Sequence, residues 1–534
     1  MKKNVKILHV IEQLGFGGAA HGTLALIKYS KLKGNFQHSI LSLLPPENNK
    51  VEEVTSQGIE VLFFLDKKQR DSHLKMTDIV QVEWWNNPAI NDFVCSALPP
   101  IRLIMWIRVN CFSSAHYLSN SFIGRADHIM LTAKRSYELD IIKSLSYEIK
   151  EKKISILFAG ADFEDLHPCF NKKKDDSFII GYIGTVEFIK MHRNYISMCS
   201  SINIPNIKFV VCGEGIIDIL KEQANKFGSK DKFEFLGYVQ DRGAQLEKFE
   251  VFGYPLNEET YATSEKSLQE AMYMGVPPVV FPYGGLDYLV QDSQTGIVVK
   301  TEEEYKEAIE FLYHNPDFRK KLGKAANEYA NNNFGAHNQT KKLHEIYNKV
   351  VNLPKKDRPE ISFSQSLILG EKDSLRGTNQ FLLSLQPIES KIFENILNKE
   401  YLIEVFYNEI KITKLSEQLL FVLKKYYYYY PTDCYLSLWM GIVYLNTLNY
   451  EKALTCFNSS LNNGLTHWRV QIYAAISAYI LGKAWKKYFK TIPTYIINEI
   501  KMEQLSLCSF TEVINFFIET SKNESNFNKN IKIY

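Results

Sequence analysis

The sequence predicts an α/β protein with two Rossmann-like domains, followed by an α-helical domain. Two apolar strands, one starting near Val5 and one near Phe178, each run into a turn that contains glycine. A strand, a glycine turn and a helix in this order form the first unit of a doubly wound parallel sheet. Further along, the stretch from Pro431 to Gly464 has the spacing of one helical repeat, which predicts a helical domain.

Length and composition restrict the class of protein. A chain of 534 residues is too long for one core, so about two to four domains are expected. With 45% hydrophobic and 23% charged residues the composition is that of an ordinary globular protein, and the net charge of +3 gives no support for broad nucleic-acid binding. Eight cysteines are scattered without a C-x-x-C pair, which disfavours a zinc site or a disulfide scaffold and fits a reducing compartment.

Hydropathy predicts a cytoplasmic location. No apolar run approaches the ~18 residues of a membrane helix. The apolar run after Lys2 and Lys3 is broken by Glu12 and Gln13, so we interpret it as a first buried strand and not as a signal peptide. We therefore expect no transmembrane segment, and peripheral attachment to the inner membrane face stays open.

The first predicted domain covers residues 1–165. Its first strand, Val5 to Ile11, leads into a turn in which Gly17 and Gly18 offer backbone amides to a phosphate. A tight turn without a ligand explains the same residues. The full G-x-G-x-x-G fingerprint is missing, so NAD binding is disfavoured.

Two later strand ends of this domain carry side chains that suit a sugar or an anion. One strand ends at Trp84 and Trp85, whose rings suit a sugar platform or, slightly favoured, core packing. The next strand ends at Arg108, which can hold a phosphate or a carboxylate through two hydrogen bonds but cannot act as a base near neutral pH. His21 and His116 are further candidates in neighbouring loops.

The second predicted domain covers residues 166–352, and its stretch from Tyr254 to Val290 carries the predicted chemistry. Thr263 and Ser264 are N-cap candidates for a helix. A short buried strand and a further helix that opens at Gly284-Gly285 are expected after it. Two helix N-termini would then face the carboxyl edge of a parallel sheet, where unpaired amides and helix dipoles make an anion site.

One segment of this stretch reads Glu270-Ala271-Met272-Tyr273-Met274-Gly275-Val276-Pro277. It resembles the donor-nucleotide site of glycosyltransferases with the GT-B fold, in particular the retaining family 4. The resemblance implies that the two Rossmann-like domains face each other across a cleft and that Glu270 binds the ribose. Family members usually have an earlier glutamate where this chain has Ala262. Glu265 is therefore assigned by inference to sugar hydroxyls or to charge balance at the anomeric centre.

Further motifs of this family follow one another from about residue 5 to residue 350. The G-R-L-x-x-x-K-G motif, whose cations neutralise the donor diphosphate, corresponds to Gly184 with Lys190 in register and Thr185 in place of the arginine. Arg108 stands where family members often hold a histidine, and with Glu265 it is the predicted catalytic pair. The resemblance implies these donor-binding residues: Gly17, Gly18, Gly184, Thr185, Lys190, Gly213, Gly237, Ser264, Glu270, Gly284 and Gly285.

Asp162 and Glu164 resemble the D-x-D metal motif of another glycosyltransferase fold. The surrounding stretch from Gly160 to Pro168, however, resembles the family's crossover between domains. No metal site is predicted, because Lys190 and the helix dipoles serve the diphosphate.

The remaining chain is predicted to be a linker at residues 353–375, a helical domain at 376–522 and a frayed tail at 523–534. Four residues of the helical part fall at the spacing of a tetratricopeptide repeat: Gly441, Tyr444, Ala453 and Phe457. A degenerate further repeat is expected from His467 to Tyr488. Such repeats favour a large acceptor or a protein partner.

The resemblance implies a hexosyltransferase of cell-surface glycan synthesis. It would move a sugar from a UDP- or GDP-sugar, used as co-substrate without a metal or other cofactor, to a saccharide, lipid-linked or protein acceptor. Retention of anomeric configuration follows from the family alone. The alternative is a catalytically decayed scaffold that binds a partner through its repeats; Ala262, Thr185 and Arg108 favour it, whereas Lys190 and Glu270 oppose it. A phosphorylase or a sugar epimerase of the same fold is a third hypothesis.

Overall fold

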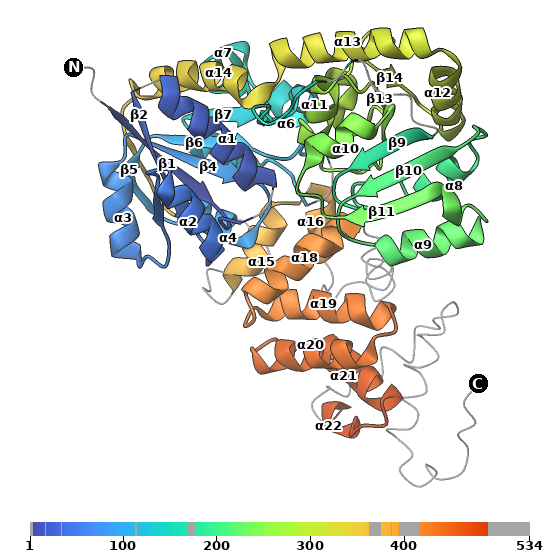
Figure 1. Cartoon of the computed structure of the whole chain (residues 1–534). Coiled ribbons are helices and arrows are strands. Elements are labelled where there is room, and N and C mark those ends of the chain that lie inside the picture. The colour runs from blue at the N-terminus through green and yellow to red at the C-terminus, as the bar shows by residue number, and fades with distance from the viewer. Residues whose placement is uncertain are drawn as a thin grey trace, which may run out of the picture. The chain divides into compact units, whose positions relative to one another are not determined.

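The computed structural model describes residues 4–15, 18–33, 35–112, 115–168, 170, 177–361, 375–385, 387–394 and 417–489. The chain divides into two units (Figure 1). Unit 1 comprises Met1–Trp85 and Ser96–Glu360, and unit 2 comprises Asn86–Cys95 and Ile361–Tyr534. The chain therefore passes between the units three times, after Trp85, after Cys95 and after Glu360.

Unit 1 begins with a seven-stranded parallel sheet of order β3-β2-β1-β4-β6-β7-β8. Every residue of its central strands β4 and β6 is buried, as expected where helices cover both faces of a parallel sheet. The strands are β1 (Val5–Ile11), β2 (Phe36–Ser42), β3 (Glu60–Leu62), β4 (Ile79–Trp84), β6 (Leu103–Ile107), β7 (His128–Leu131) and β8 (Ile154–Ile156). The helices are α1 (Gly18–Lys33), α2 (Asn48–Ser56), α3 (Lys67–Met76), α5 (Asn120–Arg125), η1 (Lys134–Glu138), α6 (Asp140–Lys143) and α7 (Tyr147–Lys153).

The second sheet of unit 1 has six parallel strands in the order β11-β10-β9-β12-β13-β14. Its strands are β9 (Phe178–Ile183), β10 (Ile207–Cys212), β11 (Phe233–Gly237), β12 (Val251–Tyr254), β13 (Pro278–Val280) and β14 (Ile297–Val298). The helices that follow them are α8 (Tyr195–Ser200), α9 (Ile217–Lys226), η2 (Lys230–Lys232), α10 (Arg242–Lys248), α11 (Lys266–Tyr273), η3 (Tyr283–Tyr288), α12 (Glu302–His314) and α13 (Pro316–Asn333).

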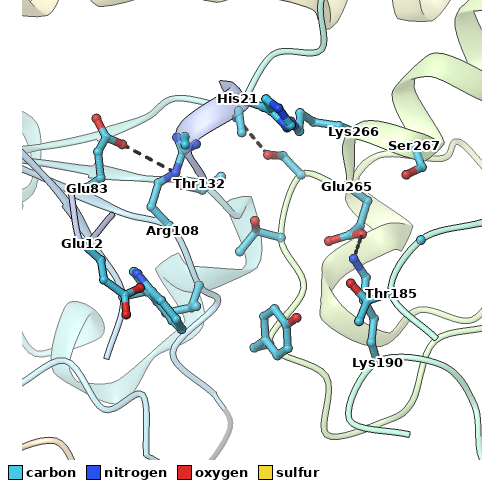
Figure 2. A pocket seen from close by; sticks show the side chains of 18 of the residues that line it. Glu12, His21, Glu83, Arg108, Thr132, Thr185, Lys190, Glu265, Lys266 and Ser267 are labelled. Atoms are coloured by element: carbon cyan, nitrogen blue, oxygen red, sulfur yellow. Dashed lines mark hydrogen bonds and ion pairs between the residues drawn. The ribbon is translucent and has the colours of Figure 1, made fainter. Parts of the chain in front are cut away.

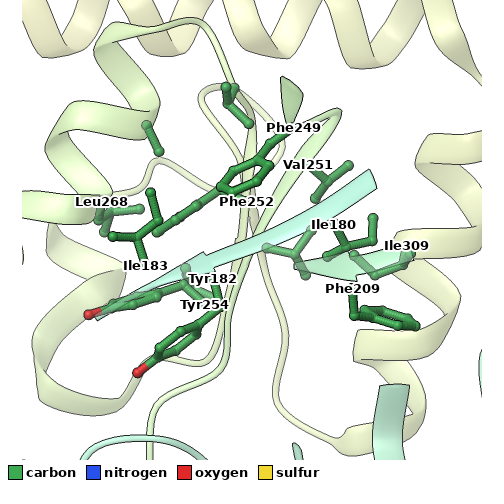
Figure 3. Packing of buried hydrophobic residues seen from close by; sticks show 14 of the residues in the cluster. Ile180, Tyr182, Ile183, Phe209, Phe249, Val251, Phe252, Tyr254, Leu268 and Ile309 are labelled. Atoms are coloured by element: carbon green, nitrogen blue, oxygen red, sulfur yellow. The ribbon is translucent and has the colours of Figure 1, made fainter. Parts of the chain in front are cut away.

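The core of the second sheet depends on a close approach between a strand and an aromatic ring. The Phe249 ring lies against Gly181 of β9 so closely that a Cβ atom at Gly181 would come within 2.0 Å of it. In the same core cluster, Tyr182 and Tyr254 stack on each other with their ring centroids 5.1 Å apart (Figure 3). Glycine is therefore required at position 181 for the space it leaves, and not for its backbone freedom.

The last long helix of unit 1, α14 (Gly335–Val350), returns to the first sheet. Its Leu343 and Tyr347 are buried in one apolar cluster with Ile7 of β1 and Ile104 of β6. This helix ties the end of the second half of unit 1 to the core of the first half.

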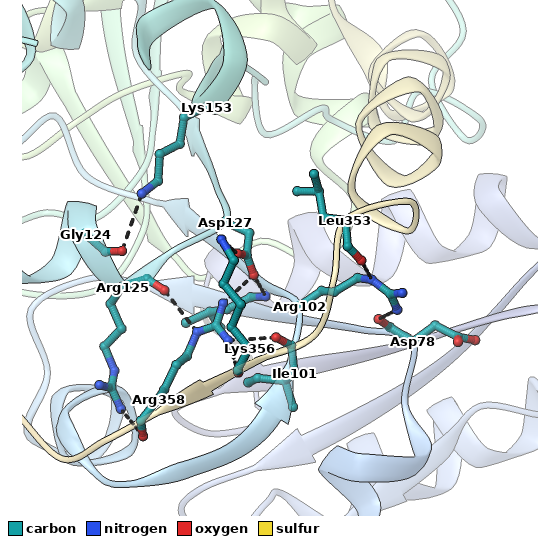
Figure 4. A network of polar contacts seen from close by, with 11 residues as sticks. Asp78, Ile101, Arg102, Gly124, Arg125, Asp127, Lys153, Leu353, Lys356 and Arg358 are labelled. Atoms are coloured by element: carbon teal, nitrogen blue, oxygen red, sulfur yellow. Dashed lines mark hydrogen bonds and ion pairs between the residues drawn. The ribbon is translucent and has the colours of Figure 1, made fainter. Parts of the chain in front are cut away.

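The segment after α14 is attached to the first sheet by an antiparallel pair of strands, β15 (Lys356–Arg358) and β5 (Leu98–Ile101). The buried Arg358 guanidinium donates to the carbonyl oxygens of Ile101 at 2.7 Å and Arg125 at 3.0 Å, and it pairs with Asp127 (Figure 4). Within the linker predicted at 353–375, Lys356–Arg358 thus form a strand, and residues 362–374 lie outside the described ranges.

Unit 2 combines a short helix from the first half of the chain with the C-terminal helices. In α4 (Pro88–Cys95) the Asn91 amide donates to the Tyr426 hydroxyl at 2.6 Å, and that hydroxyl donates to Asn86 at 2.9 Å. Arg376 forms an ion pair with Asp92. The other described helices are α15 (Arg376–Leu383), α16 (Pro387–Glu394), α18 (Glu417–Tyr429), α19 (Cys434–Asn446), α20 (Tyr450–Asn462), α21 (Trp468–Ile480) and α22 (Lys486–Phe489).

Helices α19 and α20 form the hairpin expected between Pro431 and Gly464. A Cβ atom at Gly441 would lie 2.5 Å from the Phe457 ring, and Ala453 and Phe457 are fully buried. The predicted spacing thus corresponds to real packing between the two helices, although the assignment to the tetratricopeptide family stays a prediction. Five consecutive tyrosines, Tyr426–Tyr430, stand at the end of α18, and Tyr426 among them is buried in the core. The predicted tail at 523–534 lies outside the described residues.

Within the part of the chain that the structure describes, we find no helix with the length and apolar character to cross a membrane.

Candidate active site

A pocket of about 470 Å³ lies within unit 1, where strand ends of both sheets meet (Figure 2). Its walls are formed at and after the carboxyl ends of β1, β4, β6, β7, β8, β9, β11 and β12. This is the edge at which open parallel sheets bind ligands. The charged residues of its lining are Glu12, Glu83, Arg108, Lys190, Arg242, Glu265 and Lys266.

Lys190 and Glu265 form an ion pair in this pocket. The Lys190 ammonium lies 2.9 Å from the Glu265 carboxylate, which also accepts a 2.7 Å hydrogen bond from the Tyr254 hydroxyl. Burial alone would raise the pKa of Glu265, but Lys190 and the two hydrogen bonds hold it below its ordinary value. Burial likewise opposes the charge on Lys190, and the Glu265 carboxylate raises the pKa of Lys190 above its ordinary range. Both groups are therefore charged at neutral pH.

Glu270 lies one helical turn further along α11, is almost fully buried, and is not among the lining residues of the pocket. Its carboxylate pairs with Arg242 at 3.1 Å, while burial raises its pKa above the ordinary value. Lys266 lines the pocket from the start of α11; burial, together with the cations Arg242, Arg108 and Lys190, lowers its pKa to about 8 against the attraction of Glu270.

The sequence interpretation missed Arg242 and Lys266. A signal for Lys266 was present, because Lys266 and Glu270 stand four residues apart and so share one face of α11. Arg242 follows β11 by a loop, and only the folded chain brings it to Glu270.

Arg108 follows β6 on the other side of the pocket. Its guanidinium lies 3.9 Å from the centre of the Trp106 ring and its Nε atom 3.6 Å from the Glu83 carboxylate. Burial lowers the pKa of Arg108, and Glu83 opposes that effect. Glu83 itself accepts a 2.7 Å hydrogen bond from the Gln81 amide, whose oxygen accepts one of 2.7 Å from Tyr347 of α14. Glu83 was also missed, although an acid in a mostly apolar strand was a visible signal.

Three predicted glycines shape the strand ends of the second sheet. Gly213 has φ +145°, and a Cβ atom there would lie 1.8 Å from the Gly184 carbonyl oxygen. Its amide donates to the Gly237 carbonyl at 2.7 Å. Gly184 and Thr185 line the pocket, whereas Gly213 and Gly237 are not among its lining residues. Gly213 therefore supports the loop that carries Gly184.

The prediction that a helix opens at Gly284-Gly285 is wrong. Both glycines sit inside the short 3-10 segment η3 with φ of +66° and +80°, so no regular helix N-terminus forms there. Gly284 packs beside Ala262, since a Cβ atom at Gly284 would come within 2.9 Å of the Ala262 Cβ. Neither glycine is among the lining residues of the pocket. Ala262 is 2% exposed, so the position is closed to a larger side chain.

The prediction that Thr263 or Ser264 is the N-cap of α11 is also wrong, because the helix starts at Lys266, one residue later than a Ser264 cap would require. Glu265 occupies the N-cap position without a side-chain cap. Ser264 lines the pocket, and its hydroxyl accepts a 2.9 Å hydrogen bond from the Ala159 amide of the crossover. Ser264 thus joins the two halves of unit 1, and its predicted contact with the donor stays a prediction.

The other candidates divide between pocket and core. Trp84 is buried against Phe122, while Trp85 lines the pocket. His21 lines it too, and burial with the cations Lys266, Lys50 and Arg242 lowers the pKa of His21 to about 4. His116 is buried with its ring centroid 6.3 Å from that of Tyr261.

Two remaining predictions concern the crossover and the first glycine turn. Asp162 pairs with Lys28 at 2.7 Å and accepts a hydrogen bond from Tyr29, which supports its interpretation as part of the crossover. Gly17 lies outside the described residues, and Gly18 begins α1.

Part of the chain matches a known family of domains. Residues 164–329 match the family model described as glycosyl transferases group 1. EpsD of Bacillus subtilis, named as a glycosyltransferase, is 21% identical over 198 residues, which cover 35% of this chain and 49% of that protein. The uncharacterised glycosyltransferase MJ1069 of Methanocaldococcus jannaschii is 35% identical over 88 residues, 16% of this chain and 22% of that protein. The matched region thus spans about half the length of the first of these relatives and less of the second.

Solved structures match about two thirds of the chain. A glycosyltransferase from Rickettsia africae aligns with a TM-score of 0.53 at 17% identity, covering 66% of this chain and 100% of the other. Anabaena HepE in complex with UDP aligns with a TM-score of 0.53 at 14% identity, covering 64% and 100%. Unit 1 has the GT-B fold. The predicted fold class, two Rossmann-like domains followed by helices, is confirmed, and these findings support a glycosyltransferase enzyme.

Proposed function

We propose that this chain transfers a sugar from a nucleotide-diphosphate sugar to an acceptor hydroxyl. The observation that carries the proposal is the pocket at the strand ends of a GT-B unit, in which Lys190, Arg242 and Lys266 gather on the side of the matched glycosyltransferase domain. Breaking the sugar–phosphate bond builds negative charge on the leaving diphosphate. Fixed cations in a pocket shielded from water stabilise that charge.

The cations also define how the donor is held. Lys190 binds the diphosphate, with Arg242 and Lys266 beside it, so that a metal ion is not needed for charge balance. Glu270 accepts the ribose hydroxyls of the nucleotide while it keeps its pair with Arg242. Gly184 and Thr185 line the same pocket. The Gly184 amide donates to the Cys212 carbonyl at 3.0 Å, so the backbone donor in this proposal is the Thr185 amide.

Glu265 balances the charge of Lys190 and lies next to the site of sugar transfer. In the proposed reaction, positive charge develops at the anomeric carbon as the diphosphate leaves, and a nearby carboxylate stabilises it. The acceptor attacks from the side of the leaving group, and its proton passes to the diphosphate, as in the retaining glycosyltransferases of family 4. Arg108 does not act as the base, because a guanidinium stays protonated near neutral pH.

UDP-sugars are the first donors to test, because HepE of the same fold binds UDP, and GDP-sugars are the second. We propose a saccharide, lipid-linked or protein acceptor in cell-surface glycan and polysaccharide synthesis, at a cytoplasmic site with peripheral access to the inner membrane face. Unit 2, as a tetratricopeptide-like array, would hold a large acceptor or a protein partner.

The test is donor binding and slow donor hydrolysis by the purified full chain. UDP- and GDP-sugars are titrated against the parent, Lys190→Ala and Lys226→Ala. Lys226 is an exposed lysine of α9 in the same half of unit 1, so Lys226→Ala is the matched control. We expect one donor to bind, with an affinity lowered about 10- to 100-fold in Lys190→Ala and unchanged in the control.

The buried Ala262, which closes a position where the related family carries a glutamate, favours the non-catalytic scaffold as second candidate. A parent chain that binds no donor, with both variants identical to it, would overturn the transferase and leave the scaffold.

A further inference from the structure

The pocket carries one guanidinium that the donor diphosphate does not need. Lys190, Arg242 and Lys266 come from the second half of unit 1, where the nucleotide is proposed to bind. Arg108 comes from the first sheet and lies with Glu83 and Thr132 across the pocket from Lys190 and Glu265 (Figure 2). If the nucleotide occupies the second half of unit 1, as proposed, this is the side left for the transferred sugar and the acceptor.

Arg108 is held in one orientation by contacts on several sides. The Trp106 ring lies 3.9 Å from its guanidinium carbon. Gly22 of α1 leaves room for it, since a Cβ atom there would come within 2.7 Å of Nη2. The side chain is 5% exposed. A guanidinium fixed in this way loses little conformational entropy when it binds a ligand.

A buried series of hydrogen bonds fixes Glu83, the carboxylate partner of Arg108. Tyr347 donates to Gln81, and Gln81 donates to Glu83, each at 2.7 Å. All three side chains are at most 1% exposed. Glu83 then faces the Nε atom of Arg108 at 3.6 Å, which is longer than the 2.7–2.9 Å of a charge-assisted hydrogen bond, so Glu83 orients Arg108 without a close bidentate pair.

The ion pair between Arg108 and Glu83 is not expected to stabilise the fold. Charges removed from water usually gain no stability over apolar side chains of similar volume. A guanidinium that lines a pocket, by contrast, recognises planar carboxylates and phosphates through two parallel hydrogen bonds.

We propose that Arg108 is a specificity-determining residue that binds an anionic group, a carboxylate or a phosphate, on the transferred sugar or on the acceptor. Glu83 and Gln81 are positioning residues that orient it. The proposal rests on the proposed function, because it names the substrate class of the same pocket.

The experiment compares acidic and neutral probes of otherwise equal structure on the full chain. UDP and GDP are titrated first, which identifies the nucleotide. The donor arm then compares UDP-glucose with UDP-glucuronate, or GDP-mannose with GDP-mannuronate. The acceptor arm measures release of the nucleoside diphosphate from the neutral donor in the presence of glucose, glucuronate or glucose 6-phosphate. Preference in one arm identifies whether the anion belongs to the donor sugar or to the acceptor.

We expect the parent to favour the acidic probe of one arm by about 10- to 100-fold. Arg108→Gln should lose this preference, and Arg108→Lys should keep part of it. Because Arg108→Gln leaves Glu83 buried without its cation, the double variant Glu83→Gln/Arg108→Gln removes both charges; it should also lose the preference, and UDP or GDP binding shows that it is folded.

Two outcomes would overturn the inference. If the nucleotide binds but acidic and neutral probes are equal in both arms, or the double variant keeps the preference, Arg108 is not an anion-recognition residue and the proposed function still stands. If neither UDP nor GDP binds to the parent, the proposed function fails and the inference fails with it.

Discussion

The Lys190 ammonium and the Glu265 carboxylate lie 2.9 Å apart in the pocket, with 14% and 10% of their side chains exposed. They stand 75 positions apart in the sequence and follow different strands of the second sheet. The cation proposed to bind the diphosphate thus has an internal counter-ion when no donor is present. In the proposed function the donor phosphate would share Lys190 with Glu265, so mutation of either residue should change both stability and donor binding.

Glu265→Gln should destabilise the chain, because it leaves Lys190 charged and largely buried without its partner. We expect the free energy of unfolding to fall by about 3 kcal/mol in urea titrations. Glu265 has a pKa below its ordinary 4.5 in the folded chain, so its contribution is present above that value and is lost as the pH falls through the folded pKa. The control is Glu303→Gln, whose exposed pair with Lys306 should change stability by less than about 1 kcal/mol. Equal losses in the two variants would contradict the prediction.

Lys266 should make donor affinity depend on pH near 8. Its pKa of about 8 means that the ammonium, which attracts the diphosphate, is lost as the pH rises through that value. UDP or GDP affinity measured by titration calorimetry between pH 6.5 and 9.5 should therefore fall with rising pH. Lys266→Arg keeps its charge over this range and should abolish the dependence; a curve of the same shape in Lys266→Arg would rule out Lys266 as its source.

Lys266 should also make the stability of the chain depend on pH, but in the opposite direction to donor affinity. The folded pKa of Lys266 lies below its ordinary value of 10.5, so the unfolded chain binds more protons between about pH 8 and 10.5. The contribution of Lys266 to the free energy of unfolding should rise with pH across this window. The difference between the parent and Lys266→Met, followed by urea unfolding, measures it.

Gly213→Ala should be strongly destabilising. Gly213 has φ +145°, and an added Cβ would lie 1.8 Å from the Gly184 carbonyl oxygen, so the strand end beside the pocket has to move. Gly228→Ala is the matched control, since φ there is +65° and nothing lies within 4 Å of the added Cβ. We expect about 1 kcal/mol for the control and at least about twice that for Gly213→Ala in urea unfolding. Similar losses would show that the clash relaxes without cost.

Tyr347→Phe should destabilise the protein, because the Tyr347 hydroxyl starts the series of buried hydrogen bonds that leads through Gln81 to Glu83. It removes the donor to Gln81 and leaves a buried acceptor unsatisfied, which costs about 1–3 kcal/mol. Tyr305→Phe is the control, because the Tyr305 hydroxyl is buried and makes no hydrogen bond within the described residues. Tyr305→Phe should therefore be neutral or stabilising in thermal unfolding. A neutral Tyr347→Phe would mean that the chain of hydrogen bonds contributes nothing.

Several features of this protein could be predicted from local sequence. Apolar strands followed by glycine turns identified both parallel sheets, because strand and turn preferences act over a few residues. Lys190, Glu265 and Arg108, selected from motif register and from strand ends, line one pocket. Gly441 and Phe457 likewise predicted the α19–α20 hairpin through their spacing.

Other features could not be read locally. The pair Gly284-Gly285 suggested a helix start, but both glycines have positive φ, and Gly284 packs beside Ala262 while Gly285 packs beside Arg135. Thr263 and Ser264 are good N-caps by composition, yet the Ala159 amide donates to the Ser264 hydroxyl, which a local preference cannot anticipate. Helix α4 belongs with the C-terminal helices through Asn91 and Tyr426, 335 positions apart.

The sequence by itself determined the strand–turn–helix order, the two parallel sheets and the helical hairpins, since these follow from periodicity and from residues with restricted backbone angles. Only the tertiary structure decided which charges meet: Arg242 with Glu270, Lys190 with Glu265, and Arg108 with Glu83. The physical reason is that an ion pair depends on distance in space and on burial, and both arise only when segments far apart in the chain fold against one another.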